Sequence, residues 1–238
     1  MQPARVSVLV AVRHAELFLP GCLDCLLAQS VAADLEVLVI ESEPRGGEAA
    51  IVSTYRRRFP EGRLRHLIAP RPGLYAAWNT GLRQATAELV MNLNADDRLR
   101  RDAIEILMRT LRQRPEIALA YGDSLITTVA NETFERNSSR GRRFHWPAYT
   151  HKRLLLGCIC GPHPLWRRRL HDEVGFFDES FQIAGDYEMW LRIAARHPLL
   201  RIDEPLGLYY ANPHGVSADA ALLKVENRRI VSVYFRDP

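Results

Sequence analysis

Lysine is almost absent from this chain of 238 residues, because 30 of its 32 basic residues are arginine and only Lys152 and Lys224 are lysine. The formal net charge is a modest +4 at pH 7. No recognised nucleic-acid-binding motif accompanies this charge, so we predict no nucleic-acid partner. Arginine binds phosphate through paired hydrogen bonds. The bias therefore fits a phosphorylated substrate, although genome composition produces the same bias.

Long hydrophobic runs are missing as well. No segment reaches the roughly 18 apolar residues of a membrane-spanning helix, and the first five residues lack the apolar core of a signal peptide. We therefore expect a cytoplasmic protein, with peripheral contact at the inner face of the membrane as the alternative. Because the sequence contains neither repeats nor low-complexity linkers, we predict a single domain over residues 1–238.

Cysteine is scarce, with two pairs at Cys22, Cys25 and Cys158, Cys160. Four thiolates could form a zinc site. However, the spacing of Cys22 and Cys25 places both on one face of an apparent amphipathic helix, and buried free cysteine is common. We therefore predict reduced thiols in the core.

The first half of the chain alternates between two patterns. Short apolar, β-branched runs predict strands buried on both faces, and amphipathic segments between them predict helices. The expected strands are residues 6–12, 35–40, 64–68, 88–93 and 117–121, and the expected helices are residues 17–29, 48–59, 74–85 and 102–112. This alternation predicts an α/β fold with a mostly parallel central sheet flanked by helices.

The second half loses this rhythm. Only residues 186–195 show a clear helical pattern, and residues 206–210 read as a late strand. We therefore predict a nucleotide-binding half, about residues 1–125, joined to a smaller α+β half, residues 126–238, that binds the acceptor.

Two adjacent carboxylates, Asp96 and Asp97, follow the apolar strand Leu89-Val90-Met91. In an open α/β sheet, ligands bind beyond the carboxyl ends of the strands. Carboxylates there can hold a divalent cation against a phosphate. The alternative is that both residues cap a helix starting near Arg101.

Four segments carry a family resemblance: VSVLVAV, QSVAADLEVLVIES, GLYAAWNTGLRQATAELVMNLNADD and VGFFDESFQIAGDYEMWLR. In this order, over about residues 5–215, they resemble family 2 glycosyltransferases of the GT-A fold. The stretch GPHPLWRRRLHDEVGFFDESF is similar to a bacterial subgroup often fused into larger multidomain proteins.

The resemblance implies a metal site. The family's Asp-x-Asp motif reads here Asn94-Ala95-Asp96, with Asp97 next. Asp96 is the expected main ligand, supported by Asp97 or Asn94. The ion would be Mn²⁺ or Mg²⁺, and it would offset charge on the departing diphosphate.

The resemblance also implies a general base. Asp186 matches the aspartate of the family's Glu-Asp motif, written here Gly185-Asp186, and Glu188 is the second candidate. An inverting transfer needs a carboxylate to take the acceptor's proton. Because Asp186 begins a predicted helix, we expect the helix dipole to lower its pKa. The alternative role for Asp186 is helix capping.

Further residues are expected around the substrates. By the resemblance, Glu41 pairs with the nucleotide base, while Ala11 and Arg13 replace the family's usual residues after the first strand. The start of the third helix favours a phosphate or ribose, and the alternative for its residues is ordinary helix surface. The expected donor-binding residues are Ala11, Arg13, Glu41, Arg71, Gly73, Tyr75, Asn79, Asn94, Ala95 and Asp96.

His163 and Trp166 are the expected acceptor-binding residues, because sugars stack on aromatic faces. For Trp166 the alternative is a core position. For His163, as for His214, metal ligation or simple hydrogen bonding also stays open. The basic segment from Arg140 to Arg153 is either a solvated loop, an acceptor-binding flap or a contact for an anionic membrane.

The sequence thus predicts a metal-dependent, inverting glycosyltransferase that moves a sugar from a nucleotide diphosphate to a hydroxyl acceptor on a glycan, a lipid-linked glycan or a protein. Two alternatives stay open. A nucleotidyltransferase would carry a glycine- and arginine-rich loop after the first strand, which Arg13-His14-Ala15-Glu16 does not resemble. A non-catalytic domain, fused to or assembled with others, would explain Asn94.

Overall fold

The computed structural model describes residues 3–234. Its first half alternates strands and helices. The strands are β1 (Val6–Val12), β2 (Leu35–Glu41), β3 (Leu64–Ile68) and β4 (Leu89–Asn92). The helices are α1 (Leu19–Leu27), α2 (Gly47–Tyr55), α3 (Leu74–Gln84) and α4 (Ala103–Gln113), with short 3₁₀ turns at Ala32–Asp34 and Arg56–Arg58.

The second half adds shorter and more irregular elements. Strands β5 (Arg98–Leu99) and β6 (Leu119–Thr127) complete the first half, and the strands of the second half are β7 (Arg143–Phe144), β8 (Leu165–Arg167) and β9 (Leu199–Tyr210). Its helices are α5 (His151–Leu156), α6 (Leu170–Val174), α7 (Gly185–Ala194) and α8 (Ala220–Tyr234), with a 3₁₀ turn at Val216–Ala218.

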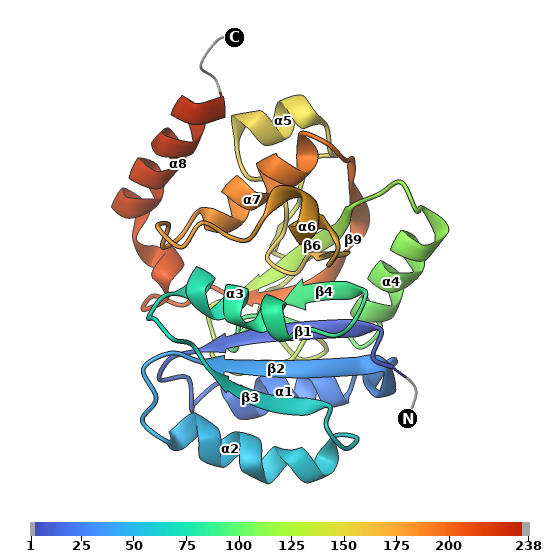
Figure 1. The fold of residues 1–238 in the computed structure, drawn as a ribbon, viewed down its shortest axis with the longest axis vertical. Helices are drawn as coiled ribbons and strands as arrows, with labels where there is room; N and C mark the ends of the chain where they lie inside the picture. Colours follow the sequence, from blue (N-terminus) through green and yellow to red (C-terminus); the bar gives the residue numbers. More distant parts are fainter. Residues whose placement is uncertain (1–2, 235–238) are drawn as a thin grey trace.

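All nine described strands form one mixed sheet in the order β3-β2-β1-β4-β8-β6-β9-β5, and β7 pairs with β6 (Figure 1). Strands β3, β2, β1 and β4 run parallel to one another, as do β6 and β9. Strand β8 lies antiparallel between β4 and β6, so both parallel groups point the same way. Their carboxyl ends therefore meet at one edge of the sheet.

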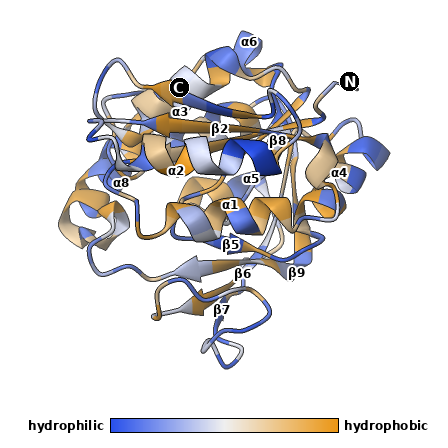
Figure 2. Cartoon of the chain, turned by 90° about the horizontal axis from the view of Figure 1, so that it is seen from below, coloured by the Kyte–Doolittle hydropathy of each residue, from blue (hydrophilic) through white to orange (hydrophobic). Residues whose placement is uncertain are grey.

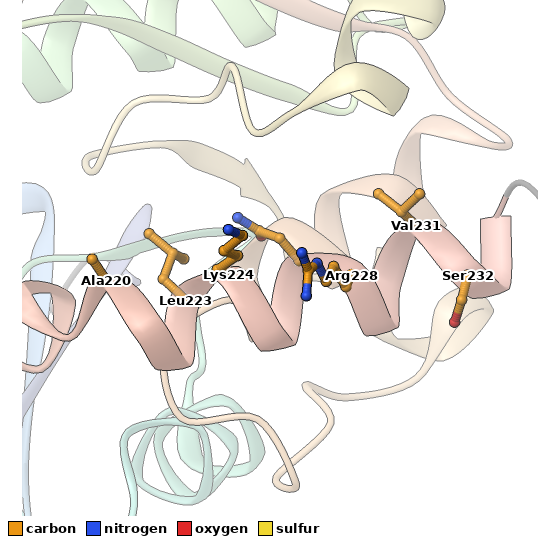
Figure 3. A pocket seen from close by; sticks show the side chains of 7 residues that line it. Ala220, Leu223, Lys224, Arg228, Val231 and Ser232 are labelled. Carbon is orange, nitrogen blue, oxygen red and sulfur yellow. The ribbon is translucent and has the colours of Figure 1, made fainter.

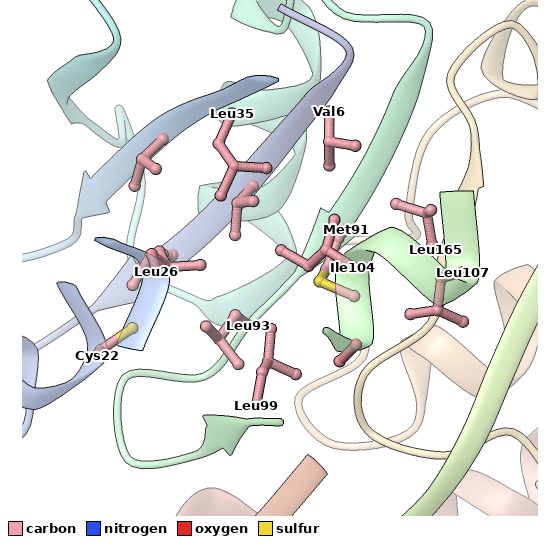
Figure 4. Close-up of a cluster of buried hydrophobic side chains, with 14 of the residues drawn as sticks. Val6, Cys22, Leu26, Leu35, Met91, Leu93, Leu99, Ile104, Leu107 and Leu165 are labelled. Atoms are coloured by element: carbon pink, nitrogen blue, oxygen red, sulfur yellow. The ribbon is translucent and has the colours of Figure 1, made fainter. Parts of the chain in front are cut away.

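The apolar strands form because both faces of the sheet are covered. Along β1, Val8 and Val10 belong to the cluster that contains residues of α1, α2 and α4, whereas Leu9 between them belongs to the cluster that contains residues of α3 and α7. Successive side chains of a strand point to opposite faces, so a strand buried on both sides is mostly apolar, and the exception in β1, Ser7, donates a hydrogen bond to Glu36. Figure 4 shows the first of these two clusters, and Figure 2 shows the apolar interior of the sheet beside hydrophilic loops near β7.

The α/β fold, the mostly parallel sheet and the elements of the first half agree with the sequence-based prediction to within a few residues. The prediction missed β5, β7, β8, α5, α6 and α8. It also made β6 and β9 too short. Both strands continue through polar residues, and their register shifts on either side of Asp123, where β9 has additional residues around Pro205.

The four cysteines are free thiols, as predicted. Cys22 and Cys25 belong to the cluster on one face of the sheet, and Cys158 and Cys160 to the cluster on the other. The two pairs therefore cannot meet in one four-thiolate site. Burial raises the pKa of all four thiols, which keeps them protonated and unreactive. Among the described helices, none has both the length and the apolar character needed to cross a membrane.

Candidate active site

The acidic motif forms a tight turn directly after β4, where the Asp97 amide donates to the Asn94 carbonyl at 3.1 Å. Asp97 is fully buried and its carboxylate points into the protein. Its Oδ2 accepts from Asn94 Nδ2 at 3.1 Å, and its Oδ1 accepts from the Tyr210 amide of β9 at 2.9 Å. Asp97 thus binds the turn to the neighbouring strand.

His163 contacts the same carboxylate. Its Nε2 lies 3.2 Å from Asp97 Oδ2, in an approach that is electrostatic rather than an aligned hydrogen bond. Its Nδ1 lies 3.3 Å from the Ser124 hydroxyl on β6. The ring is 4% exposed. The structure therefore places His163 beneath the acidic motif and not on a surface that faces an acceptor.

Gly207 on β9 makes room for this histidine. A Cβ at position 207 would lie 2.2 Å from His163 Nδ1. We expect Gly207→Ala to displace the ring, to lower stability by about 1–3 kcal/mol, and to weaken Mn²⁺ binding because Asp97 loses a contact. Urea unfolding and calorimetry with Mn²⁺ measure the two effects. Gly157→Ala is the control, since no atom lies within 4 Å of its added Cβ; equal effects of both substitutions would contradict the prediction.

Asp96 is the accessible carboxylate of the motif. It is half-buried, and its Oδ2 accepts from Asn212 Nδ2 at 3.1 Å. Burial and the neighbouring charge of Asp97 raise its pKa. A divalent cation would relieve both penalties, so the donor chemistry at Asp96 fits Mn²⁺ or Mg²⁺. The sequence reading missed Asn212, which lies 116 positions further along the chain.

Arg98 stabilises the turn from inside the protein, and the sequence-based prediction did not include it. Its buried guanidinium donates to the carbonyls of Ala95 at 2.9 Å and Asp97 at 2.6 Å. It also donates to Asn131 Oδ1 at 2.8 Å. The available signal was an arginine directly after two aspartates; the structure buries its charge, and a buried charge must be paired. Ala95 is itself buried and contributes only backbone to this arrangement.

Asp186 lies at the start of α7, and its Oδ1 accepts from the Tyr187 amide at 2.8 Å. Burial raises its pKa to about 6, against the lowering effect of that amide and of the Tyr75 hydroxyl. The expectation of a lowered pKa is therefore wrong. The helix end does stabilise the charge, but the loss of water around the carboxylate outweighs it.

Tyr75, in the first turn of α3, is held against Asp186. Its hydroxyl donates to the Ile183 carbonyl at 2.6 Å, accepts from the Gly185 amide at 2.8 Å and lies 3.4 Å from Asp186 Oδ1. A Cβ at Gly185 would approach its ring to 2.7 Å. Tyr75 thus packs over the position where the family has glutamate. It is 1% exposed, so it positions this loop rather than lining an open donor site.

Asp96 and Asp186 lie at the same edge of the sheet. Asp96 follows the carboxyl end of β4, and α3, which carries Tyr75, follows the carboxyl end of β3. Because β3 and β4 point the same way, the contact between Tyr75 and Asp186 brings α7 to this edge. Two carboxylates of raised pKa thus stand at the site of ligand binding in open α/β sheets.

Other residues expected at the donor site surround the start of α3. Gly73 has φ +119° at the helix N-cap, a conformation that favours glycine. Arg71 before it is 75% exposed and lies 3.6 Å from Glu179. Asn79 is buried: its Nδ2 donates to the Phe177 carbonyl and its Oδ1 accepts from the Phe177 amide. Asn79 therefore holds the loop before α7, and the exposed Arg71 could exchange its partner Glu179 for a charged ligand.

The ends of β1 and β2 carry the remaining expected donor residues. Ala11 is half-buried near the end of β1. Arg13 is exposed and pairs with Glu43 at 3.6 Å. Glu41 is buried, with its Oε2 2.7 Å from His66 Nε2 and its Oε1 accepting from the Arg45 amide. In this arrangement protein partners already occupy both oxygens of Glu41.

Trp166 and Glu188 are held by other side chains. Trp166 is 0% exposed, packs against Trp190 and donates to His171 Nε2 at 2.9 Å. The structure thus places it in the core, with no exposed ring face for an acceptor. Glu188 forms an ion pair with Arg192 at 2.7 Å one turn further along α7.

Asp123, His145 and Asp203 form another cluster of possible metal ligands, with ligand atoms within 4.8 Å of one another. Among the residues that the structure describes, it is the one cluster of three such side chains. Arg201 donates to both Asp123 oxygens at 3.0 Å. Although burial opposes it, these bonds lower the pKa of Asp123. Arg201 already supplies the positive charge that balances Asp123, so a cation is not needed there. Asp123 also lies 3.7 Å from Arg143 and thereby holds the basic segment to the sheet.

A shallow groove of about 470 Å³ runs along the outer face of α8 (Figure 3). Its lining, which includes Leu223, Lys224 and Arg228, comes entirely from α8. None of the candidate catalytic carboxylates borders this groove, so it does not mark the active site.

Comparison with known proteins settles the family. The model of Glycosyl transferase family 2 matches residues 7–175. The chain belongs to this family. A curated relative, chondroitin synthase from Escherichia coli, is 26% identical over 200 residues, which cover 84% of this chain and 28% of that protein. This family 2 chain thus spans about a quarter of the length of that relative.

Solved structures support the GT-A fold of this family 2 domain. TarS residues 1–349 from S. aureus, in complex with UDP-GlcNAc, superimposes with a TM-score of 0.74 at 17% identity, covering 96% of this chain and 66% of that one. The mannosyltransferase PcManGT from Pyrobaculum calidifontis, in complex with GDP-Man and Mn²⁺, gives 0.73 at 19% identity, covering 100% and 66%. The predicted family and fold are both confirmed.

Proposed function

We propose that this domain is a metal-dependent, inverting glycosyltransferase that moves a sugar from a nucleotide diphosphate to a hydroxyl group. The observation that carries the proposal is the placement of both Asp96 and Asp186 at the carboxyl edge of the sheet, each with a pKa raised mainly by burial. Asp96 is suited to binding a cation, and Asp186 is suited to accepting a proton. Such division of labour between two carboxylates is typical of transfer chemistry.

The donor is the first substrate. Asp96, supported by Asn94, would hold Mn²⁺ or Mg²⁺, which when bound neutralises charge on the diphosphate. Asp97 keeps the turn in place through Tyr210 and His163. Arg71 and the start of α3 offer positive charge and free amides to the phosphates. The relatives whose complexes contain UDP-GlcNAc or GDP-Man support a nucleotide-sugar donor.

The transfer itself needs one proton acceptor. As the acceptor oxygen attacks the anomeric carbon, the bond from that carbon to the diphosphate oxygen breaks and Asp186 takes the hydroxyl proton. With a pKa of about 6, Asp186 is ionised at pH 7 yet basic enough to accept a proton. The acceptor is a glycan, a lipid-linked glycan or a protein, and the chain acts alone or within a longer protein.

Calorimetry of UDP, GDP and dTDP, with and without Mn²⁺, tests the donor site. We expect manganese-dependent binding of one nucleotide, followed by release of that nucleoside diphosphate during transfer. Release of pyrophosphate would instead identify a nucleotidyltransferase. Binding without any transfer would identify a non-catalytic domain of a larger assembly.

The pH dependence of kcat tests the base. Because Asp186 must be ionised, we expect kcat to fall on the acid side of about pH 6, tenfold for each further pH unit. Initial rates between pH 4.5 and 8 at saturating donor measure this limb. An acid limb near pH 4 would mean that a carboxylate of ordinary pKa is the base.

A further inference from the structure

Helix α8 contributes a single buried charge to the protein. Glu226 is the only acidic residue of α8 and is 5% exposed. Its Oε1 accepts from the Gln182 amide at 2.7 Å, and its Oε2 accepts from the amides of Ile183 at 2.9 Å and Ala184 at 2.8 Å. One carboxylate thus binds three consecutive backbone amides. Such charge-assisted hydrogen bonds are about twice as strong as neutral ones.

These three amides lie directly before Gly185 and Asp186, where α7 begins. The same loop is held from the opposite side by Tyr75, whose hydroxyl bonds the Ile183 carbonyl and the Gly185 amide. Side chains of α3 and α8 therefore both hydrogen bond to the loop of residues 182–185, and this loop sets the direction of the Asp186 side chain.

Apolar contacts also hold α8 against the protein. Ile230, one turn further on, is 1% exposed and belongs to the cluster that contains residues of α7, and an apolar stripe of this kind docks a helix without any charge. Burying a carboxylate costs free energy unless it is fully hydrogen bonded. A buried charge in this position therefore indicates a need for a fixed loop rather than for a docked helix.

We propose that Glu226 is a positioning residue of the transfer reaction, which fixes residues 182–184 and thereby sets the place of Asp186 relative to the acceptor hydroxyl. This inference rests on the proposed function, in which Asp186 is the base. Glu226 itself touches neither substrate. A displacement of about 1 Å in a catalytic group costs roughly 100-fold in rate, so a loosened loop should lower kcat while leaving the donor site intact.

The charge of Glu226 adds a second signature. The titratable groups that face Asp186 are Tyr75 from α3, Glu226 from α8, and the thiols of Cys158 and Cys160. The tyrosine and the thiols stay neutral because burial raises their pKa. Burial is the main cause of the raised pKa of Asp186 and the charge of Glu226 adds to it, so removal of that charge should move the acid limb of kcat to lower pH.

Glu226→Gln tests the proposal, because glutamine keeps the size but replaces one acceptor oxygen with an amino group. We expect a 10- to 100-fold lower kcat, an acid limb at lower pH, a Kd for the nucleotide with Mn²⁺ within twofold of wild type, and faster amide exchange at residues 182–184. Ile230→Val is the matched control. It should lower Tm through lost packing and leave kcat and the acid limb unchanged.

The outcomes separate two failures. If wild type binds the nucleotide but transfers no sugar, the proposed function fails, and the role of Glu226 fails with it before any variant is made. If wild type transfers sugar and Glu226→Gln changes Tm alone, with kcat and its pH profile unchanged, the function stands and the positioning role is overturned. Equal losses of kcat in both variants would also overturn it, because docking of α8 would then be the cause.

Discussion

Asp186→Asn is expected to lower kcat for sugar transfer by about 10³-fold, since a positioned general base contributes roughly 10² to 10⁴. Asparagine can still accept the hydrogen bond of the Tyr187 amide, so the loop should keep its shape. Donor binding with Mn²⁺ should therefore stay within twofold of wild type. Initial rates at saturating substrates and calorimetry of the nucleotide measure the two quantities.

Glu188→Gln is the matched control for this experiment. Glu188 lies on the same helix, two residues further on, and pairs with Arg192. We expect this variant to retain most of the activity. If the large loss of kcat appeared in Glu188→Gln instead, the base would be misassigned, and a loss of donor binding in Asp186→Asn would show that the residue supports the donor site.

Asp186→Asn should also make the folded protein more stable than wild type above pH 6. Burial raises the pKa of Asp186 from 3.8 to about 6 in the folded protein, so the stability that this group contributes is fully present below pH 3.8 and is lost as the pH rises through 6. Asparagine never ionises. After allowance for partial exposure, we expect a gain of about 2 kcal/mol at pH 8 and almost none at pH 4. Urea unfolding at the two pH values measures the difference.

The second large effect is expected at the metal motif. Asp96→Asn should weaken manganese-dependent nucleotide binding by about 100-fold or more, because even groups that only orient metal ligands contribute 10- to 100-fold. Metal-independent binding should change little. The matched control is Asp102→Asn, which removes a half-exposed carboxylate that pairs with Arg100 near the start of α4. Unchanged manganese dependence in Asp96→Asn would remove the metal from the proposal.

Local pattern was sufficient to predict the first half of the fold. The apolar strand β1 and the carboxylates after β4 are both readable, because burial on two faces demands continuous apolar sequence and ligands bind at strand ends. Asp186 was proposed from the family resemblance and not from local pattern, and the direction of its pKa shift was wrong. The direction of that shift depends on how much water the folded chain removes, and burial is not a local property of sequence.

The missed residues depend on distant contacts. Asn212 contacts Asp96, 116 positions earlier in the sequence. Glu226 contacts the loop before α7, as far as 44 positions earlier. Strand β8 has three residues, too few to show a period, and its Trp166 could belong either to a core or to a sugar site until its neighbours were known. Pairings of this kind are made by topology, and one sequence contains no record of them.

The position of β8 in the sheet has a consequence for engineering and for evolution. This strand belongs to the second half of the chain, yet it pairs with β4 on one side and β6 on the other, and β5 crosses in the opposite sense to pair with β9. A fragment that ends near residue 125 would therefore lose the strand between β4 and β6 and expose aggregation-prone edges. Chimeras joined at that point would have to rebuild the middle of a sheet. New acceptor preferences in this scaffold are more readily reached through the loops at the carboxyl edge than by exchanging halves.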